Sequence, residues 1–399
     1  MRTAIARRLG CEVPIFAFSH CRDVVVEVTK AGGFGVLGAS TFSPEHLEHE
    51  LRWIDEHVGD RPYGVDIIIP TTYDAEAEAQ DDPEKLIPRQ HREFMEGILA
   101  KEGVPELPPE ERERVRREIV TGRGAMTPDG ARRLLDVTLN HPRVTLVVSA
   151  LGAPPPDVVE RLKARGIMIG ALCGKAAHAL RQKAAGVELI VAQGTEAGGH
   201  TGDIATLVLV PQVLEACPDI PVLAAGGISR GSQIAAALAL GAEGVWTGTI
   251  WLGTRESELT PFEKDAVFAA RAEDAVRRKA RTGKTVRMIR SKLSEAWEQP
   301  GAPPYLPTPL QGILYNEMHA RVVRAQRRDL YSFPVGQSVT SVNEETSVRE
   351  VMLRLQNEYL AAVERFMTIV EAEGARRSWS ARKTASRSSR STGRNSAMR

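Results

Sequence analysis

Short apolar segments alternate with amphipathic segments of helical length from residue 13 to about residue 250. Runs of aliphatic and β-branched residues bounded by glycine, proline or charged positions are typical of buried strands. Eight such runs are predicted strands: Val13–Phe18, Gly35–Leu37, Gly64–Ile69, Val144–Val148, Ile167–Ala171, Leu189–Ala192, Val222–Ala225 and Gly244–Thr247. The predicted helices between them include Pro44–His57, Pro128–Asn140, Asp157–Arg165, Gly174–Ala185 and Gly231–Leu240.

This order of elements predicts the fold class. Nearly continuous apolar strands separated by helices are typical of a parallel sheet, because crossover helices cover its faces. Eight βα units predict closure into an α/β barrel, the (β/α)₈ or TIM barrel, over residues 1–260. The chain has 399 residues, of which 42% are hydrophobic and 26% charged, an ordinary globular balance. This length is sufficient for a single barrel with insertions.

Residues 71–127, between the third and fourth predicted strands, interrupt the rhythm. They are rich in charge and proline and contain one predicted helix, Pro109–Val120. Long insertions on barrel loops serve as lids or docking surfaces, or are solvated excursions with no role at the site. The sequence leaves both interpretations open.

After Thr254 the pattern becomes helical. We expect residues 261–375 to form a helical extension that packs on the barrel. Its predicted elements are the helices Pro261–Ala280 and Val348–Ala372 and an extended, proline-rich connector, Pro300–Pro309.

The formal net charge of +1 is unevenly distributed. Residues 376–399 contain seven arginines, one lysine and no acid, so residues 1–375 carry a net charge of −7. An acidic body gives no support for nucleic-acid binding by the folded part. The serine- and arginine-rich tail cannot bury a core and is predicted to be disordered, with a nucleic-acid role for it as the alternative.

Four scattered cysteines, Cys11, Cys21, Cys173 and Cys217, form no CxxC motif. This usage favours a reducing compartment and gives no spacing for a metal site. The N-terminus has no signal-peptide pattern, and no run of about 18 apolar residues predicts a membrane helix. We therefore expect a cytoplasmic protein without a metal.

Three glycine-containing segments lie just past the ends of the last three predicted strands: 193–202, 224–231 and 246–249. In a barrel these strand ends share one face, where active sites form. Glycines let backbone approach a flat ligand closely and take positive φ. Backbone amides at the start of a helix, and the loops after strands seven and eight, are frequent phosphate ligands. The three segments predict a binding site for a phosphate-bearing ligand. His200, which lies within the first segment, is expected beside that ligand.

The same residues carry a family resemblance. The segments AQGTEAGGHTGD and LAAGGISRGSQIAAALALGAEGVWTGT resemble the nitronate monooxygenase family, formerly the 2-nitropropane dioxygenases. The opening PIFAFSHCRDVVVEVTKAGGFGVLGAS is also similar, so the likeness spans roughly residues 10–255. It implies an FMN-dependent TIM barrel, which that family shares with the flavin-dependent enoyl-ACP reductases.

The resemblance also implies residue roles. His200 is expected to be catalytic, near the reactive edge of the flavin, as the base that removes the α-proton of neutral nitroalkanes. Imidazole suits this task because its pKa is near neutrality. The residues expected to bind FMN are Phe18, Ser19, His20, Asp66, Gln193, Gly198, Gly199, Gly226, Gly227, Trp246, Thr247, Gly248 and Thr249.

Two positions depart from the family pattern. Phe18-Ser19-His20 stands where the family usually has Pro-Met, and Asp66 stands where it often has Asn. An acid at this position can accept a flavin N–H hydrogen bond, but its charge would alter flavin electrostatics. His20 faces the predicted site and either binds ligand or is a structural histidine satisfied by backbone. His178, in mid-helix, is interpreted as structural.

The predicted function is oxidation of alkyl nitronates with O₂ to carbonyl compounds and nitrite. The alternative is an NAD(P)H-dependent flavin reductase acting on an enoyl thioester or a quinone. No GxGxxG follows an early strand, so a nicotinamide would bind directly over the flavin. A barrel without flavin, such as a phosphosugar isomerase or aldolase, is a third hypothesis. The expected partners are a small-molecule substrate and O₂, with no nucleic acid and no membrane.

Overall fold

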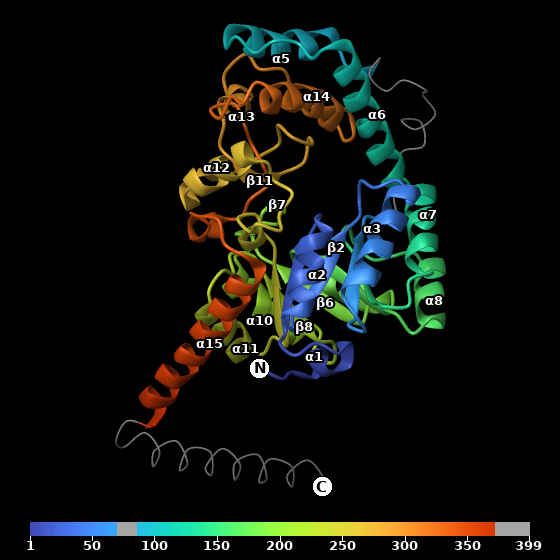
Figure 1. The fold of residues 1–399 in the computed structure, drawn as a ribbon, viewed down its shortest axis with the longest axis vertical. Coiled ribbons are helices and arrows are strands. Elements are labelled where there is room, and N and C mark those ends of the chain that lie inside the picture. Colours follow the sequence, from blue (N-terminus) through green and yellow to red (C-terminus); the bar gives the residue numbers. More distant parts are fainter. Residues whose placement is uncertain (70–85, 372–399) are drawn as a thin grey trace, which may run out of the picture.

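The computed structural model describes residues 1–69 and 86–371. Eight parallel strands form a closed barrel in the order β1-β2-β3-β4-β5-β6-β8-β9, and β9 pairs with β1 (Figure 1). The strands are β1 (Ile15–Ser19), β2 (Phe34–Gly38), β3 (Tyr63–Ile67), β4 (Val144–Ser149), β5 (Met168–Cys173), β6 (Leu189–Gln193), β8 (Val222–Ala225) and β9 (Gly244–Thr247). The predicted TIM barrel and its eight strands are confirmed.

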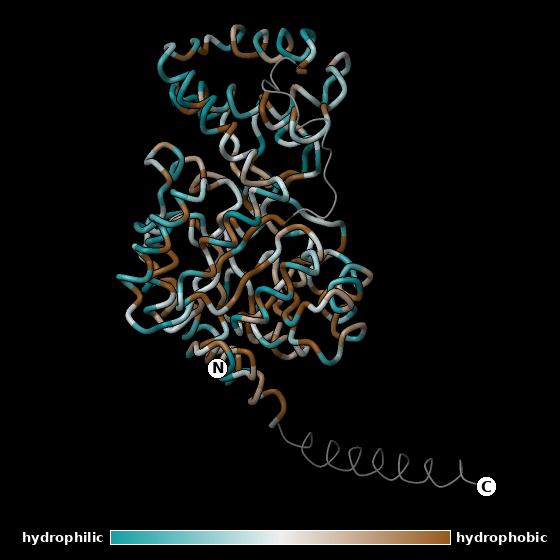
Figure 2. The backbone as a smooth tube through the Cα atoms, turned by 90° about the vertical axis from the view of Figure 1, so that its right-hand side faces the viewer, coloured by the Kyte–Doolittle hydropathy of each residue, from teal (hydrophilic) through white to brown (hydrophobic). Residues whose placement is uncertain are grey.

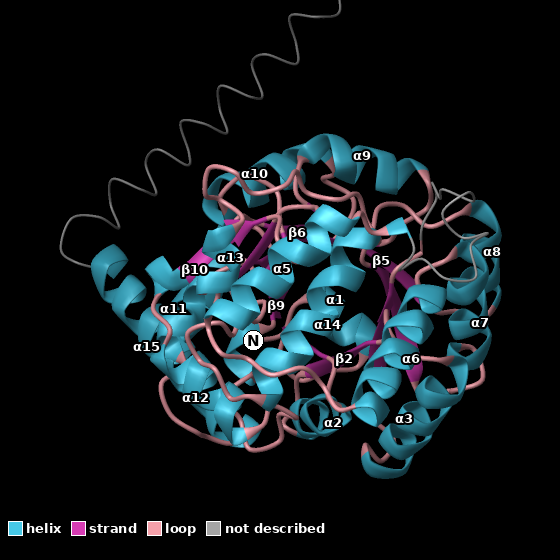
Figure 3. Ribbon diagram, turned by 90° about the horizontal axis from the view of Figure 1, so that it is seen from above, coloured by secondary structure: helices cyan, strands magenta, loops and turns pink. Residues whose placement is uncertain are grey.

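Helices surround the barrel, as the view from above shows (Figure 3). They are α2 (Arg22–Lys30), α3 (Pro44–His57), α7 (Pro128–Thr138), α8 (Pro156–Ala164), α9 (Ala176–Ala184), α10 (Thr206–Ala216) and α11 (Gly231–Leu240). Two of them begin with the same local signal. The hydroxyls of Ser43 and Thr127 accept amide N–H bonds from the first turns of α3 and α7, and proline follows at the first helical position.

The barrel interior is filled by apolar side chains, and hydrophobic stretches run through the lower body of the molecule (Figure 2). Phe16, Phe34 and Leu146 belong to this interior cluster. Helix α1 (Ala4–Leu9), which the sequence did not predict, closes the N-terminal end with Ile5 and Leu9. Because the centre is packed, a ligand can bind only at the C-terminal mouth.

The insertion after β3 forms α5 (Arg89–Lys101) and α6 (Pro109–Ala125) above that mouth. The predicted helix Pro109–Val120 is confirmed and continues to Ala125. Helix α5 was not predicted. The first part of the insertion, residues 70–85, lies outside the described residues.

The C-terminal extension is helical but contains a small sheet that the sequence did not predict. Its elements are α12 (Pro261–Ala269), β10 (Ala275–Arg278), β11 (Val286–Ile289), α13 (Lys292–Ala296), α14 (Leu310–Arg324) and α15 (Val348–Glu371). Strand β11 pairs antiparallel with β10 and with β7 (Gly199–His200), a short strand in the loop after β6. The proline-rich connector before α14 contains neither helix nor strand.

The predicted helix Pro261–Ala280 is wrong beyond Ala269. Ala270 is extended, and a 3₁₀ turn follows in which the Asp274 carboxylate accepts the amide N–H of Arg271. The chain then enters β10. Its hydrogen-bond partners come from β11, so tertiary pairing overrides the local helical pattern.

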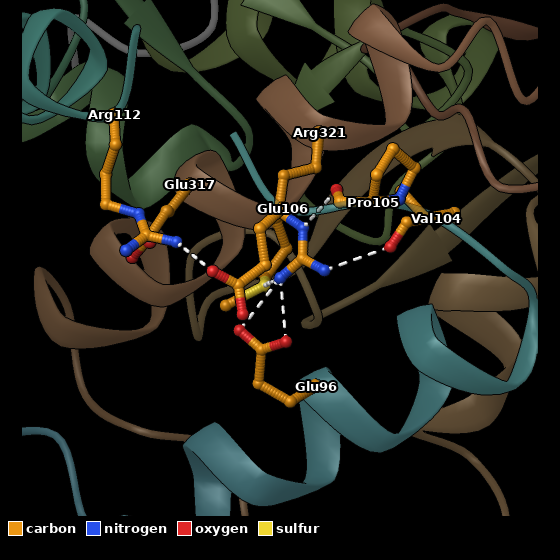
Figure 4. A network of polar contacts seen from close by, with 8 residues as sticks. Glu96, Val104, Pro105, Glu106, Arg112, Glu317 and Arg321 are labelled. Atoms are coloured by element: carbon orange, nitrogen blue, oxygen red, sulfur yellow. Dashed lines mark hydrogen bonds and ion pairs between the residues drawn. The ribbon is translucent and has the colours of Figure 1, made fainter. Parts of the chain in front are cut away.

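Insertion and extension are joined by a buried cation (Figure 4). The guanidinium of Arg321, on α14, is only 4% exposed and donates to both carboxylate oxygens of Glu96, at 2.8 and 2.7 Å. It also donates to the carbonyl oxygens of Pro105, at 3.0 Å, and Val104, at 3.1 Å. A buried charge is stable only when it is paired. We call the joined unit, residues 86–125 and 261–342, the cap.

Helix α15 leaves the cap and packs on α11 and α2 of the barrel before extending away from it (Figure 1). Among the described residues, no helix is long and apolar enough to cross a membrane. The predicted disordered tail, residues 376–399, lies outside the described residues.

Candidate active site

The floor of the candidate site is aromatic. The ring of Phe18, at the end of β1, stacks 6.1 Å from the Trp246 ring of β9 and meets the His20 ring edge-on at 5.1 Å. Phe18 and Trp246 both belong to or pack on the interior cluster. A Cβ at Gly38 of β2 would be 2.7 Å from Phe18 and 2.8 Å from His20, so only glycine leaves this space. The mouth therefore ends in an apolar surface flanked by an imidazole.

His20 is anchored to the backbone on one side. Its Nδ1 lies 2.7 Å from the carbonyl oxygen of Gly38, and a carbonyl can only accept, so Nδ1 carries the proton. Burial lowers the imidazole pKa below 6.5, and the charge of Arg281 lowers it further. The neutral ring thus has a free Nε2. The side chain is nevertheless exposed to solvent.

His200 lies in β7, opposite Val286 of the cap sheet. Its Nε2 is 2.9 Å from the hydroxyl of Thr282, and its side chain is exposed. Surrounding protein atoms still desolvate the ring and lower its pKa, and the charges of Lys284 and Arg281 add to this effect. His20 and His200 are therefore two neutral imidazoles. They come from the end of the first strand and from the loop after β6, and the positive charge of Arg281 lowers the pKa of both.

Asp66 is the last residue but one of β3 and is in register with Gly38. Its neighbours Val65 and Ile67 belong to the outer cluster, so the Asp66 side chain points into the barrel. It is buried, and desolvation raises its pKa to about 8. At neutral pH the group is mainly a protonated, uncharged acid, which can donate as well as accept a hydrogen bond.

Four backbone amides at the mouth are free. Gly226 and Gly227, after β8, have φ of 103° and 71°. The N–H groups of Gly226, Gly227, Gly248 and Thr249 donate no hydrogen bond within the described part of the chain. A Cβ at Gly248 would approach nothing closer than 4.0 Å, so the space beside this amide is open. Unpaired amides around an open space fit an anionic ligand such as a phosphate.

The start of α11, in contrast, is not available to a phosphate as predicted. The amides of Ser229 and Arg230 donate to the side-chain oxygen of Gln233, at 2.8 and 3.0 Å. The amide of Gly231 donates to Glu358 of α15, at 2.8 Å. Both the helix itself and the C-terminal extension thus satisfy this terminus, and the unpaired amides of Gly226 and Gly227 lie just before it.

The hydroxyls near the mouth are already engaged. Thr247 donates to the carbonyl of Phe16, at 3.0 Å, and accepts from the indole of Trp251, at 3.1 Å. Thr249 accepts the amide N–H of Gly336 at 2.8 Å, and Ser19 accepts that of Cys21 at 3.1 Å. Thr247 can therefore offer a ligand mainly backbone groups, whereas the hydroxyls of Thr249 and Ser19 only accept in these bonds and keep a proton to donate.

The glycine loop after β6 faces both barrel and cap. Gln193 is half-buried, and its side chain makes no hydrogen bond to any described residue. A Cβ at Gly198 would be 2.7 Å from the carbonyl carbon of Val335, whereas one at Gly199 would enter open space. The loop thus packs closely against the extension at Gly198 and faces open space at Gly199.

Sequence reasoning missed the residues that the cap brings to this mouth. Arg281, Thr282 and residues 335–337 come from the extension, and no local signal marked them. Among the described residues, no group of three His, Cys, Asp or Glu side chains could hold a metal ion.

A closed parallel barrel with histidines and unpaired amides at its C-terminal mouth defines a (β/α)₈-barrel enzyme. The chain belongs to the nitronate monooxygenase family, whose model matches residues 19–358, and it is an oxidoreductase. The resemblance seen in the sequence is confirmed.

Known proteins agree with this assignment. The chain is 47% identical to an unconfirmed monooxygenase of Mycobacterium tuberculosis, over 93% of this chain and 100% of that protein. It is 26% identical to a "Probable nitronate monooxygenase" of Staphylococcus aureus, over 75% and 81% of the two chains. The structure of a nitroalkane oxidase from Streptomyces ansochromogenes matches with a TM-score of 0.74 and 27% identity, over 90% and 99%. FabK from Thermotoga maritima matches with a TM-score of 0.68 and 25% identity, over 92% and 99%.

Proposed function

We propose that this chain binds FMN at the barrel mouth and oxidises alkyl nitronates with O₂ to carbonyl compounds and nitrite. The observation that carries the proposal is the set of four unpaired amides, at Gly226, Gly227, Gly248 and Thr249, at the same barrel mouth as two neutral histidines. Family membership and the likeness to a nitroalkane oxidase support the reaction class.

The residues present fit this cofactor. The four amides would hold the phosphate, and Phe18, Trp246, Gln193 and the loop Gly198–Gly199 would surround the ring. Bound FMN supplies the electron and O₂ chemistry. The neutral acid Asp66 would bring a hydrogen-bond donor or acceptor to the ring without an added negative charge, in the manner of the amide that the family often has there.

His200 would act as the base for neutral nitroalkanes. Its low pKa keeps the ring unprotonated, so it can take the α-proton when a nitroalkane lies against it. The Thr282 hydroxyl at Nε2 orients the ring. A nitronate has already lost this proton, so it needs only to be positioned and shielded from water.

Absorbance and nitrite release test the proposal directly. The purified protein is expected to show a flavin spectrum, to release FMN on denaturation, and to consume O₂ with ethyl nitronate or propionate 3-nitronate while nitrite accumulates. Full FMN occupancy without nitrite above the buffer control would reject the reaction. A colourless protein that takes up no FMN would reject the cofactor as well.

The reductase alternative is separated by a second measurement. Rapid anaerobic bleaching of the flavin by NADH or NADPH, with turnover of an enoyl thioester or a quinone, would favour it. Slow bleaching together with nitrite release supports the nitronate reaction.

A further inference from the structure

The loop that joins β10 to β11 is a cationic hairpin above the mouth. The two arginines in β10 have acidic partners. Nη1 of Arg277 is 2.7 Å from Oδ1 of Asp203, and Nε of Arg278 is 3.8 Å from Oε1 of Glu298. Lys279, Arg281 and Lys284, in the loop itself, form no ion pair with any acid in the described part of the chain. The loop therefore presents uncompensated positive charge.

Of these three cations, Arg281 is the one whose side chain packs against the cap, whereas Lys279 and Lys284 are exposed. Its Cζ lies 5.4 Å above the ring centre of Tyr315, which is fully buried in the cap. The Nη1 atom of Arg281 and the hydroxyl of Tyr315 are both buried, and neither has a hydrogen-bond partner among the residues that the structure describes. Nη1 itself is closed to solvent, but the Arg281 side chain as a whole is only partly buried, so the rest of the guanidinium can meet an external acceptor.

The position of Arg281 connects it to the candidate site. The next residue, Thr282, holds His200 through the 2.9 Å contact to Nε2. The charge of Arg281 also reaches His20, on the other side of the mouth. Because both imidazoles are kept neutral, neither can supply the positive charge that an anion requires.

We propose that Arg281 is an anion-binding residue that receives the coplanar oxygen pair of a small planar anion, such as a nitronate, at the mouth. A guanidinium fork matches two coplanar oxygens, and the Tyr315 ring beneath holds the fork in place. Lys279 and Lys284 are exposed and add attractive potential along the approach. The identity of the substrate rests on the proposed function; anion binding at Arg281 does not.

Calorimetry with an unreactive anion tests the assignment without turnover. Isobutyrate has the charge, the branched skeleton and the coplanar oxygen pair of propyl-2-nitronate, although its α-carbon is tetrahedral. It cannot be oxidised in the same way, and isobutyramide is its neutral counterpart. The purified holoprotein is titrated with each. We expect isobutyrate to bind more tightly than isobutyramide, and Arg281→Gln to weaken isobutyrate binding by about 30-fold or more while leaving isobutyramide unchanged.

Two further variants keep the test decisive. Arg281→Lys retains the charge but not the fork, and should recover only part of the affinity. Lys279→Gln removes an exposed cation of the same loop, and should change affinity by about threefold or less. If Arg281→Gln fails to fold, the lysine variant alone decides: full wild-type affinity in Arg281→Lys would overturn bidentate recognition. Equal isobutyrate affinity in wild type and Arg281→Gln would overturn the whole assignment.

Activity then separates this inference from the proposed function. Arg281-dependent isobutyrate binding without nitronate oxidation would reject the reaction and keep the anion site. Nitronate oxidation with a KM that is the same in wild type and Arg281→Gln would reject the anion site and keep the reaction.

Discussion

The barrel and the cap are stabilised in different ways. In the barrel, each strand pairs with two neighbours, and apolar clusters fill the inside and the layer under the helices. The cap also has an apolar cluster, but buried cations connect its layers. Arg321 joins α14 to the insertion, and Arg287, which is 7% exposed, donates to the carbonyl of Thr195 on the barrel loop at 2.8 Å.

The barrel and the cap also contribute different groups to the candidate site. The barrel supplies rigid features: an aromatic floor, a neutral acid and free amides. The cap supplies charge, through Arg281, and orientation, through Thr282. A steric change in a strand should therefore affect folding, whereas removal of a buried charge should affect the cap and leave the barrel intact.

The largest expected effect is steric and lies in the barrel. In Gly35→Ala the new Cβ would be 2.3 Å from the backbone carbonyl oxygen of Val25, which cannot rotate away. We expect destabilisation of more than about 4 kcal/mol, seen as loss of soluble protein or a large drop in the urea midpoint. Gly97→Ala is the control, because its Cβ enters open space on α5. It should stabilise by about 0.5–1 kcal/mol. Similar midpoints for the two variants would contradict the steric argument.

The next effect should be confined to the cap. Arg321→Met keeps the apolar stem but leaves Glu96 and two carbonyls without their donor, so we expect a loss of about 3 kcal/mol. Hydrogen exchange should report it in cap peptides while barrel peptides keep their protection. Arg324→Met, which removes a pair 43% and 39% exposed, should cost about 0.5 kcal/mol or less. Equal loss of protection in the barrel would show that the two regions unfold together.

His200 lies where barrel loop and cap sheet meet, and its replacement tests chemistry. His200→Gln should lower kcat/KM for nitroethane by about 100-fold or more, because the base is lost, but for ethyl nitronate by about threefold or less. Since its pKa is lowered from 6.5, the acid limb of the wild-type nitroethane profile should lie below pH 6.5. His178→Gln, on α9, is the control. An equal loss for both substrates would assign His200 to positioning.

The smallest effect concerns pH and Asp66. The folded protein keeps the Asp66 proton to about pH 8, whereas the unfolded chain releases it near 3.8. Folding is then coupled to proton uptake between these values, so wild-type stability falls as pH rises through this window. Asp66→Asn lacks this effect. We compare the free energies of unfolding of the two flavin-free proteins in urea melts. The difference, Asp66→Asn minus wild type, should increase by about 2 kcal/mol from pH 6 to pH 8. A difference that does not change with pH would mean that Asp66 is ionised.

Sequence was sufficient for the barrel because its signals are local. Each strand is a short apolar run, and helix starts such as Ser43-Pro44 have their capping partner within three residues. Predicted site residues from three distant turns also came together at one mouth. Their roles toward a flavin stay predictions.

The cap was not predictable in the same way because its partners are far apart in sequence. The sequence of β10 is helical in pattern, and only its pairing with β11 makes it a strand. No neighbour in the sequence marked Arg281 as a residue of the mouth. The protonation state of Asp66 depends on the dry interior around it, which composition does not reveal. The helix-start amides of α11 looked free because Glu358, which occupies one of them, lies 127 residues later.

The hydrogen bonds of residues 336 and 337 have a consequence for biosynthesis. Gly336 donates to Thr249 beside the phosphate-type amides, and Gln337 donates to the carbonyl of Glu196 in the loop after β6. On a ribosome, all eight barrel strands are made before this short stretch exists. The mouth therefore cannot reach its final form until residues 336 and 337 have been made, late in translation.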